Sequence, residues 1–159
     1  MEKKWHIAPQ QGGLMHISDL LQNHLLINSL TAWATAQILK TIIYACANKE
    51  LDWERLFGDG GMPSGHSATV TALAVTAALE YGLASPVFAV AAILAIVVMH
   101  DAMGIRLEAG KHAKMLNDLM DFVRSDLTAD DKLKELLGHT PLQVCSGALL
   151  GVVVALLLG

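Results

Sequence analysis

Four long apolar runs dominate the chain and predict four helices that cross a membrane. They cover residues 25–47, 67–83, 86–105 and 142–159. The first has 23 residues and a single charge, Lys40, so it exceeds the length of about 20 residues that a spanning helix needs. The second is short and rich in Ala, Thr and Ser, as expected for a helix shielded by its neighbours. A tight turn at residues 81–86 predicts that the second and third helices form a hairpin.

The polar stretches predict a tail and a surface helix. Residues 1–23 lack the apolar core of a signal peptide and form a tail with a possible interfacial helix, so residues 24–159 are expected to be one membrane domain. Between the third and fourth runs, apolar residues recur at helical spacing and predict an amphipathic helix lying at the membrane surface. A capping-box pattern at 128–131 predicts a second short helix ending at Gly138. The apolar residues of the amphipathic helix are Ala109, Ala113, Leu116, Met120, Val123 and Leu127.

Composition supports an all-α, polytopic membrane bundle. Hydrophobic residues make up 53% of the chain and charged residues only 16%, against about 25% charged in a typical soluble domain. The net charge of −4 argues against a nucleic-acid partner. Cys46 and Cys145 both lie in apolar runs, so we interpret them as reduced packing residues.

The distribution of Lys and Arg predicts the orientation. With four spans, the loops 48–66 and 106–138 share one side and carry eight basic residues, whereas the other side has only Lys3 and Lys4. The positive-inside rule then places both loops in the cytoplasm, with both termini outside.

The candidate chemistry begins at residues 60–68, Gly-Gly-Met-Pro-Ser-Gly-His-Ser-Ala. This turn opens the second helix, with Ser64 or Ser67 as its N-cap, and a helix N-terminus suits a phosphate. Gly65 lets the backbone approach a ligand, and His66 can exchange a proton near neutral pH. The alternative is an ordinary Gly-Pro turn with a capping serine and a surface histidine.

The predicted topology brings four charged or titratable residues to the same membrane face. Lys40 lies roughly 10 Å deep at 1.5 Å per residue, and Arg106 follows the third span. His66 and His139 each stand at a helix start. Two histidines and two cations suit a phosphoanion, because one imidazole can attack phosphorus while the other protonates the leaving oxygen. Taken singly, Lys40 is better explained as an interfacial lysine and Arg106 as a positive-inside anchor. Only the set of four favours a site, because charges within a membrane are usually functional.

Two stretches carry a resemblance to a known family. Residues 63–66, Pro-Ser-Gly-His, and residues 139–151 resemble two signatures of the type-2 phosphatidic acid phosphatase superfamily, which also includes vanadium-dependent haloperoxidases. The stretches 60–74, 100–106 and 136–151 look more like its divergent branch of small bacterial and plant membrane proteins. The resemblance covers about residues 25–159.

The resemblance implies a role for each of the candidate residues. His139 corresponds to a nucleophile that forms a phosphohistidine, and His66 to the general acid. Lys40 and Arg106 correspond to cations that clamp the phosphate, with donors from Ser64 and Gly65. The superfamily's phosphatases need no metal or other cofactor, so none is expected here.

The chain departs from the superfamily pattern at three places. Ala47 and Asn48 stand where an Arg-Pro pair is usual, and Arg106 precedes His139 by 33 residues instead of about six. Gln143 replaces the acid that orients the nucleophile, and an amide cannot stabilise an imidazolium as a carboxylate does. Asp101, on the same side, is our candidate substitute partner for His139 or Arg106.

These observations predict a lipid phosphatase of a bacterial inner membrane, with its site facing the cytoplasm. The expected substrate is a lipid phosphate monoester or pyrophosphate, with phosphatidylglycerophosphate or phosphatidate favoured by the orientation. The alternative is a non-catalytic membrane protein that binds lipid phosphate or scaffolds partners. Gly147-x-x-x-Gly151 predicts a helix-packing face, either inside the bundle or in a homodimer.

Overall fold

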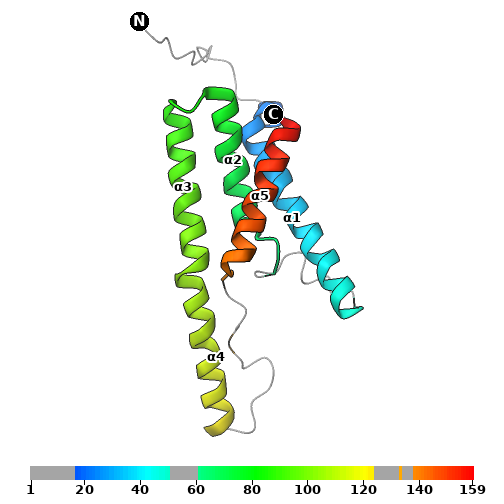
Figure 1. Ribbon diagram of the computed structural model, residues 1–159, viewed down its shortest axis with the longest axis vertical. Helices are drawn as coiled ribbons and strands as arrows, with labels where there is room; N and C mark the ends of the chain where they lie inside the picture. The colour runs from blue at the N-terminus through cyan, green and yellow to red at the C-terminus, as the bar shows by residue number, and fades with distance from the viewer. Residues whose placement is uncertain (1–16, 51–60, 124–132, 134–137) are drawn as a thin grey trace, which may run out of the picture.

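The structure is a computed structural model that describes residues 17–50, 61–123, 133 and 138–159. Every secondary-structure element in its described part is a helix (Figure 1). The elements in chain order are η1 (Ile17–Gln22), α1 (His24–Asn48), α2 (Gly65–Tyr81), α3 (Pro86–Met103), α4 (Ile105–Val123) and α5 (Pro141–Leu158). The four predicted apolar helices therefore correspond to α1, α2, α3 and α5.

The helix starts follow from short polar side chains that accept a hydrogen bond from the first turn. Asn23 caps α1, Ser64 caps α2, Ser85 caps α3 and Thr140 caps α5. Proline stands in the first turn of α3 and of α5, where no intrahelical N–H is needed.

Helix α2 lies at the centre of the bundle and packs against α1, α3 and α5 (Figure 1). The core between them consists mainly of alanines, because small side chains let helix backbones approach closely. One cluster joins α1, α2 and α5, and a second joins α2 and α3. These clusters are Ala32, Ala36, Ala68, Ala72, Val154 and Ala155, and Val70, Ala74, Ala77, Ala91 and Ala95.

The two glycines of α5 form its contact with α2. A Cβ atom built onto Gly147 would overlap the carbonyl oxygen of Ser64, and one on Gly151 would overlap that of Ala68. Of the two predicted uses of this face, the structure therefore shows packing inside the bundle. Helix α2 of the same chain covers both glycines, and a homodimer through this face stays a prediction.

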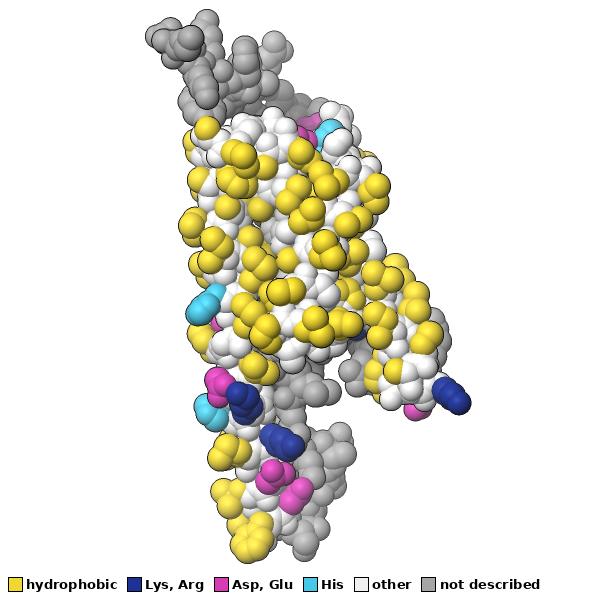
Figure 2. Space-filling model, in the orientation of Figure 1, with side chains coloured by type: hydrophobic (Ala, Val, Ile, Leu, Met, Phe, Trp, Pro, Cys, Tyr) yellow, Lys and Arg dark blue, Asp and Glu magenta, His cyan; other side chains and the backbone are white. Residues whose placement is uncertain are grey.

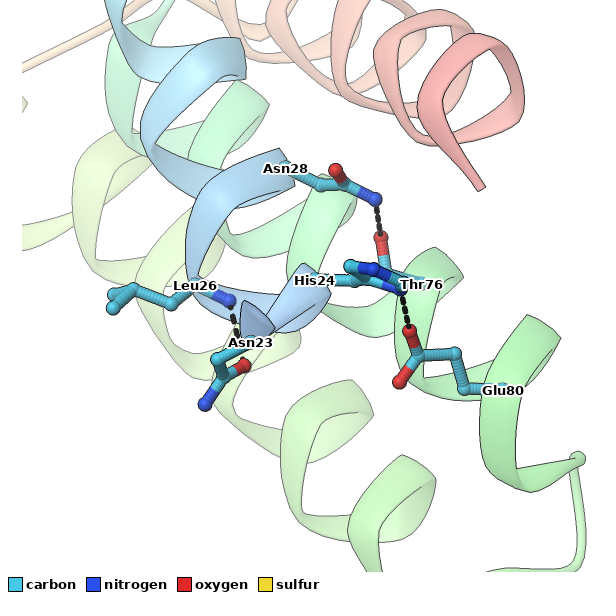
Figure 3. A network of polar contacts seen from close by, with 6 residues as sticks. All are labelled: Asn23, His24, Leu26, Asn28, Thr76 and Glu80. Atoms are coloured by element: carbon cyan, nitrogen blue, oxygen red, sulfur yellow. Dashed lines mark hydrogen bonds and ion pairs between the residues drawn. The ribbon is translucent and has the colours of Figure 1, made fainter. Parts of the chain in front are cut away.

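Polar contacts join α1 to α2 at the end away from the start of α2 (Figure 3). The buried Asn28 Nδ2 donates to Thr76 Oγ1 at 3.1 Å. One turn further out, His24 Nδ1 lies 2.7 Å from Glu80 Oε1. Because each pair joins residues far apart in sequence, together they fix the register of α1 on α2.

Apolar side chains cover the outer surface of the bundle (Figure 2). By length and composition, two helical stretches in the described ranges suit a membrane crossing, one beginning with α3 and the other being α5. This apolar surface agrees with a membrane protein, while four complete crossings stay a prediction.

Helix α4 differs in direction from the expected surface helix. Figure 1 draws it along the continuation of the α3 axis, after a turn at Gly104, so it leaves the end of the bundle instead of crossing it. Lys111 donates a hydrogen bond to Glu108 at 2.6 Å, which lowers the pKa of that exposed carboxyl. Leu127 and the second short helix predicted at 128–138 lie outside the described residues, except for Leu133 and Gly138.

Candidate functional site

The turn before α2 is held by Ser64. Its Oγ accepts hydrogen bonds from the Ser67 backbone N–H at 3.3 Å and from Ser67 Oγ at 3.1 Å. Its own N–H donates to the carbonyl oxygen of Gln143 in α5 at 3.0 Å. Ser64 is thus the predicted N-cap, its N–H binds the protein, and its role as a phosphate donor stays a prediction. Gly65, which follows as the first residue of α2, keeps its predicted place at the helix N-terminus.

Lys40 of α1 is buried beneath the same turn, with 6% of its surface exposed. A Cβ atom on Gly61 would lie 2.8 Å from Lys40 Cδ and 2.9 Å from Cγ, and Gly61 has φ of +83°. Only glycine combines this backbone conformation with so close an approach. The lysine stem therefore runs against the segment that leads into α2.

The start of α5 places His139, which is 4% exposed. The Thr140 hydroxyl accepts from the Gln143 N–H at 3.4 Å, and Gln143 Oε1 accepts from the Thr140 N–H at 3.0 Å, which completes a capping box. The His139 N–H donates to the carbonyl oxygen of Ala102 at 2.9 Å, which ties the start of α5 to the last turn of α3.

The same Gln143 oxygen sets the tautomer of His139. Oε1 lies 3.3 Å from His139 Nδ1. Because the Thr140 N–H can only donate, the amide atom at this point is the oxygen, and Nδ1 must carry the proton to bond to it. A neutral His139 imidazole then has its lone pair on Nε2, the nitrogen that can attack an electrophile.

The rings of His66 and His139 lie next to each other. Their centroids are 5.9 Å apart and their planes are inclined by 60°. The two residues are 73 positions apart in sequence and come from the N-termini of α2 and α5. The Ser64–Gln143 backbone hydrogen bond holds these two helix starts together, and both direct their positive dipole ends to this region.

For two predicted site residues, Asp101 and Arg106, the structure shows the position in the fold, while the side-chain contacts stay predictions. Asp101 is half-buried in the last turn of α3, one residue before the Ala102 carbonyl that binds His139. The imidazole of His139 contacts Gln143, so a contact from Asp101 stays a prediction. The backbone of Arg106 lies in the first turn of α4, and its side chain is outside the described part of the structure.

The structure adds one neighbour of the turn and one structural contact that the sequence analysis did not single out. Gln37 of α1 is 6% exposed, and its Oε1 lies 3.6 Å from where a Cβ on Gly65 would be. Gln37 stands three residues before Lys40 on the same helix face, and this spacing could have identified it from the sequence. The pattern Thr140-x-x-Gln143 was likewise readable as a capping box, which explains the glutamine as a structural residue as well as a partner of His139.

The arrangement of these residues suits an anion, and anion binding stays a prediction. A buried lysine and two helix N-termini supply positive charge, and both imidazoles face the same region. Among the described residues, no three His, Cys, Asp or Glu side chains gather as a metal ion would need.

Comparisons with known proteins show the family of the chain. Residues 21–154 match the family described as "Divergent PAP2 family". The chain is 45% identical over 152 residues to the "Uncharacterized membrane protein YuiD" of Bacillus subtilis (strain 168), covering 88% of this chain and 96% of that protein. No solved structure matches. The family match spans the turn before α2, the start of α5 and the histidines of both, and the predicted resemblance is confirmed: the chain belongs to the divergent PAP2 family.

Proposed function

We propose that the chain is a membrane phosphatase that hydrolyses a lipid phosphate through a phosphohistidine on His139. The observation that carries the proposal is the pairing of two imidazoles, 5.9 Å apart, at the starts of α2 and α5. A nucleophile needs its target atom at about 3–3.5 Å, and a general acid needs the leaving oxygen at about 2.6–3.2 Å. The proposal therefore places the phosphoryl group where both imidazoles reach it, with His139 Nε2 at phosphorus and His66 at the leaving oxygen.

The first step transfers the phosphoryl group to the protein. The lone pair on His139 Nε2 attacks phosphorus, so that an N–P bond forms and the P–O bond to the lipid breaks. Protonated His66 gives its proton to the leaving oxygen, and the lipid departs as an alcohol, or as a phosphate if the substrate is a pyrophosphate. Gln143 holds the Nδ1–H throughout and thereby keeps the ring oriented.

The second step returns the protein to its starting state. His66, now neutral, takes a proton from water, whose oxygen attacks phosphorus and breaks the N–P bond. Inorganic phosphate leaves, and the electron pair returns to His139 Nε2. Charge on the phosphoryl oxygens is balanced by Lys40, the N–H groups at the start of α2 and Arg106, the cation that the family resemblance adds.

The proposed substrate is a lipid because the site lies at one end of an apolar bundle. The outer surfaces of α1, α3 and α5 are apolar over their length, so a substrate with acyl chains can remain in the bilayer while its phosphate reaches the site. The predicted cytoplasmic orientation favours phosphatidylglycerophosphate or phosphatidate over polyprenyl pyrophosphates, which are processed on the outer face.

A second function is favoured by one specific feature, the amide of Gln143. An amide oxygen that already accepts from Thr140 offers His139 a dipole but no negative charge. A protein with this site could hold lipid phosphate without turning it over. The two functions differ in phosphate release but share phosphate binding.

The deciding experiment measures phosphate release by the purified full chain in detergent micelles. Phosphatidylglycerophosphate, phosphatidate and undecaprenyl pyrophosphate are the substrates, and orthovanadate, which mimics the phosphoryl transition state, is the inhibitor. We expect His139→Ala to lower turnover by at least about 10³-fold and His66→Ala by about 10²–10⁴-fold.

His100→Ala is the matched control, because His100 is an exposed histidine at the end of α3. It should retain wild-type turnover. Vanadate binding without phosphate release from any lipid would replace the phosphatase with the binding protein. Release that persists in His139→Ala would refute the assignment of the nucleophile.

A further inference from the structure

Asn117 of α4 makes a contact that none of the proposed chemistry explains. It is 2% exposed on a helix whose other residues are mostly exposed. Its Nδ2 donates to the Leu133 carbonyl oxygen at 2.8 Å, and its Oδ1 accepts from the Leu133 N–H at 2.9 Å. The Leu133 side chain is 45% exposed, so the contact holds the backbone and not a buried leucine.

The contact links α4 to Leu133, a residue close in sequence to the site. Leu133 precedes His139 by six residues, and the His139 N–H is bonded to Ala102 at the end of α3. The chain is therefore tied to α3 at His139 and to α4 at Leu133. Arg106 lies on the helical path between these two ties, four residues after Ala102 and eleven before Asn117.

The position of Asn117 makes it an effective restraint on the direction of α4. The helix joins α3 at Gly104, whose missing side chain gives the joint the most conformational freedom. Asn117 is 13 residues further on, which corresponds to a lever of about 20 Å at 1.5 Å per residue. A displacement of Asn117 by about 1 Å at this distance corresponds to a rotation of α4 about Gly104 of only about 3°.

We infer that Asn117 is a positioning residue of the site. By holding the backbone of Leu133, it fixes the direction of the helix that carries Arg106 relative to the segment that carries His139. This inference rests on the proposed function, in which both residues act on one phosphoryl group. A misplacement of about 1 Å in such a group can cost about 10²-fold in rate, so a side chain remote from the phosphate has a measurable effect.

The test compares Asn117→Ala in two backgrounds, wild type and Arg106→Ala. The readouts are the dissociation constant of orthovanadate and the turnover of phosphatidate by the full chain in detergent. If Asn117 acts through Arg106, we expect Asn117→Ala to weaken vanadate binding about tenfold in the wild type and less than about twofold when Arg106 is already absent. If Asn117→Ala only lowered the stability of the fold, it would weaken vanadate binding by the same factor in both backgrounds.

Two further variants keep the test decisive. Asn117→Asp preserves the volume of the side chain and removes the donor to the Leu133 carbonyl, so it replaces Asn117→Ala if that variant does not fold. Lys114→Ala, at an exposed position one turn earlier on α4, should leave vanadate binding unchanged. Hydrogen exchange in a peptide containing Leu133 reports whether the contact itself has been broken.

The outcomes separate this inference from the proposed function. Faster exchange at Leu133 with vanadate binding and turnover unchanged would overturn the positioning role while leaving the phosphatase intact. Equal losses in the two backgrounds would overturn it as well. A wild-type protein that neither binds vanadate nor releases phosphate would overturn the proposed function, and this role with it.

Discussion

At the scale of single residues, two glycines of the same turn serve different purposes. Gly61 has φ of +83° and leaves no room for a side chain above Lys40. A Cβ on Gly65 would meet Trp33 Cδ1 at 3.5 Å and Gln37 Oε1 at 3.6 Å, which are ordinary van der Waals distances. The fold therefore demands glycine at position 61 but not at position 65, and the proposed function expects a phosphate close to the backbone at position 65.

We predict that Gly61→Ala lowers the stability of the fold, whereas Gly65→Ala weakens vanadate binding without lowering stability. Gly61→Ala should cost about 1–2 kcal/mol of stability from its left-handed conformation alone, with more from the contact with Lys40. Gly65→Ala should unfold at the wild-type temperature in detergent but bind orthovanadate more weakly. Gly65→Ala with unchanged vanadate affinity would mean that phosphate does not approach this backbone.

A second prediction concerns Gln143. Gln143→Glu keeps the reach that spans His139 Nδ1 and the Thr140 N–H, whereas aspartate is one methylene shorter. The added carboxylate also lies at the N-terminus of α5, where negative charge is favourable. We expect a higher rate of phosphate release, because a carboxylate stabilises the charged ring better than an amide. A lower rate with intact folding would contradict the assignment of Gln143 as the orienting partner.

At the scale of helices, the contact of α5 with α2 depends on the absence of side chains. A Cβ on Gly151 would overlap the Ala68 carbonyl oxygen and lie 3.0 Å from Ala72 N. We predict that Gly151→Ala destabilises the bundle by about 1–3 kcal/mol, as overpacking does. Thermal unfolding in detergent measures this, with Leu149→Ala on the exposed face of α5 as the control. Equal melting temperatures for the two variants would refute the close packing.

The helices themselves could be predicted from the sequence, whereas their directions could not. Apolar runs bounded by Asn23, Ser64, Ser85 and Thr140 define the bundle helices, because capping and hydrophobic length act locally. The direction of α4 depends on the turn at Gly104 and on the contact between Asn117 and Leu133, which join distant positions. Periodicity identifies the apolar face of a helix but not its neighbour.

The same distinction applies to the site. The approach of His66 to His139 was predictable because membrane topology places both helix starts on one face. The bond from the Ser64 N–H to the Gln143 carbonyl was not, since it depends on how deeply the glycines of α5 let that helix pack against α2. That bond pairs the Ser64 N–H with the start of α5.

At the scale of the whole molecule, the site must face the compartment that holds its substrate. We predict that the thiol of Lys114→Cys is protected from a membrane-impermeant thiol reagent in intact cells. The thiol of Ala84→Cys should be labelled by the same reagent. Both positions are exposed, Lys114 on α4 and Ala84 in the turn between α2 and α3. Cys46→Ser and Cys145→Ser provide the background. The reverse labelling pattern would place the site outside and favour substrates of the outer leaflet.

The central claim is a covalent phosphohistidine at His139. In His66→Ala, transfer from p-nitrophenyl phosphate does not need a general acid, because its leaving group is stable as an anion, whereas attack by water still lacks its base. The intermediate should therefore accumulate. Peptide mass spectrometry after quenching without acid should find one added phosphoryl group at His139 in this variant and none when His139→Ala is combined with it. Phosphate release by the wild type with an unmodified His139 in the trapped variant would contradict the mechanism.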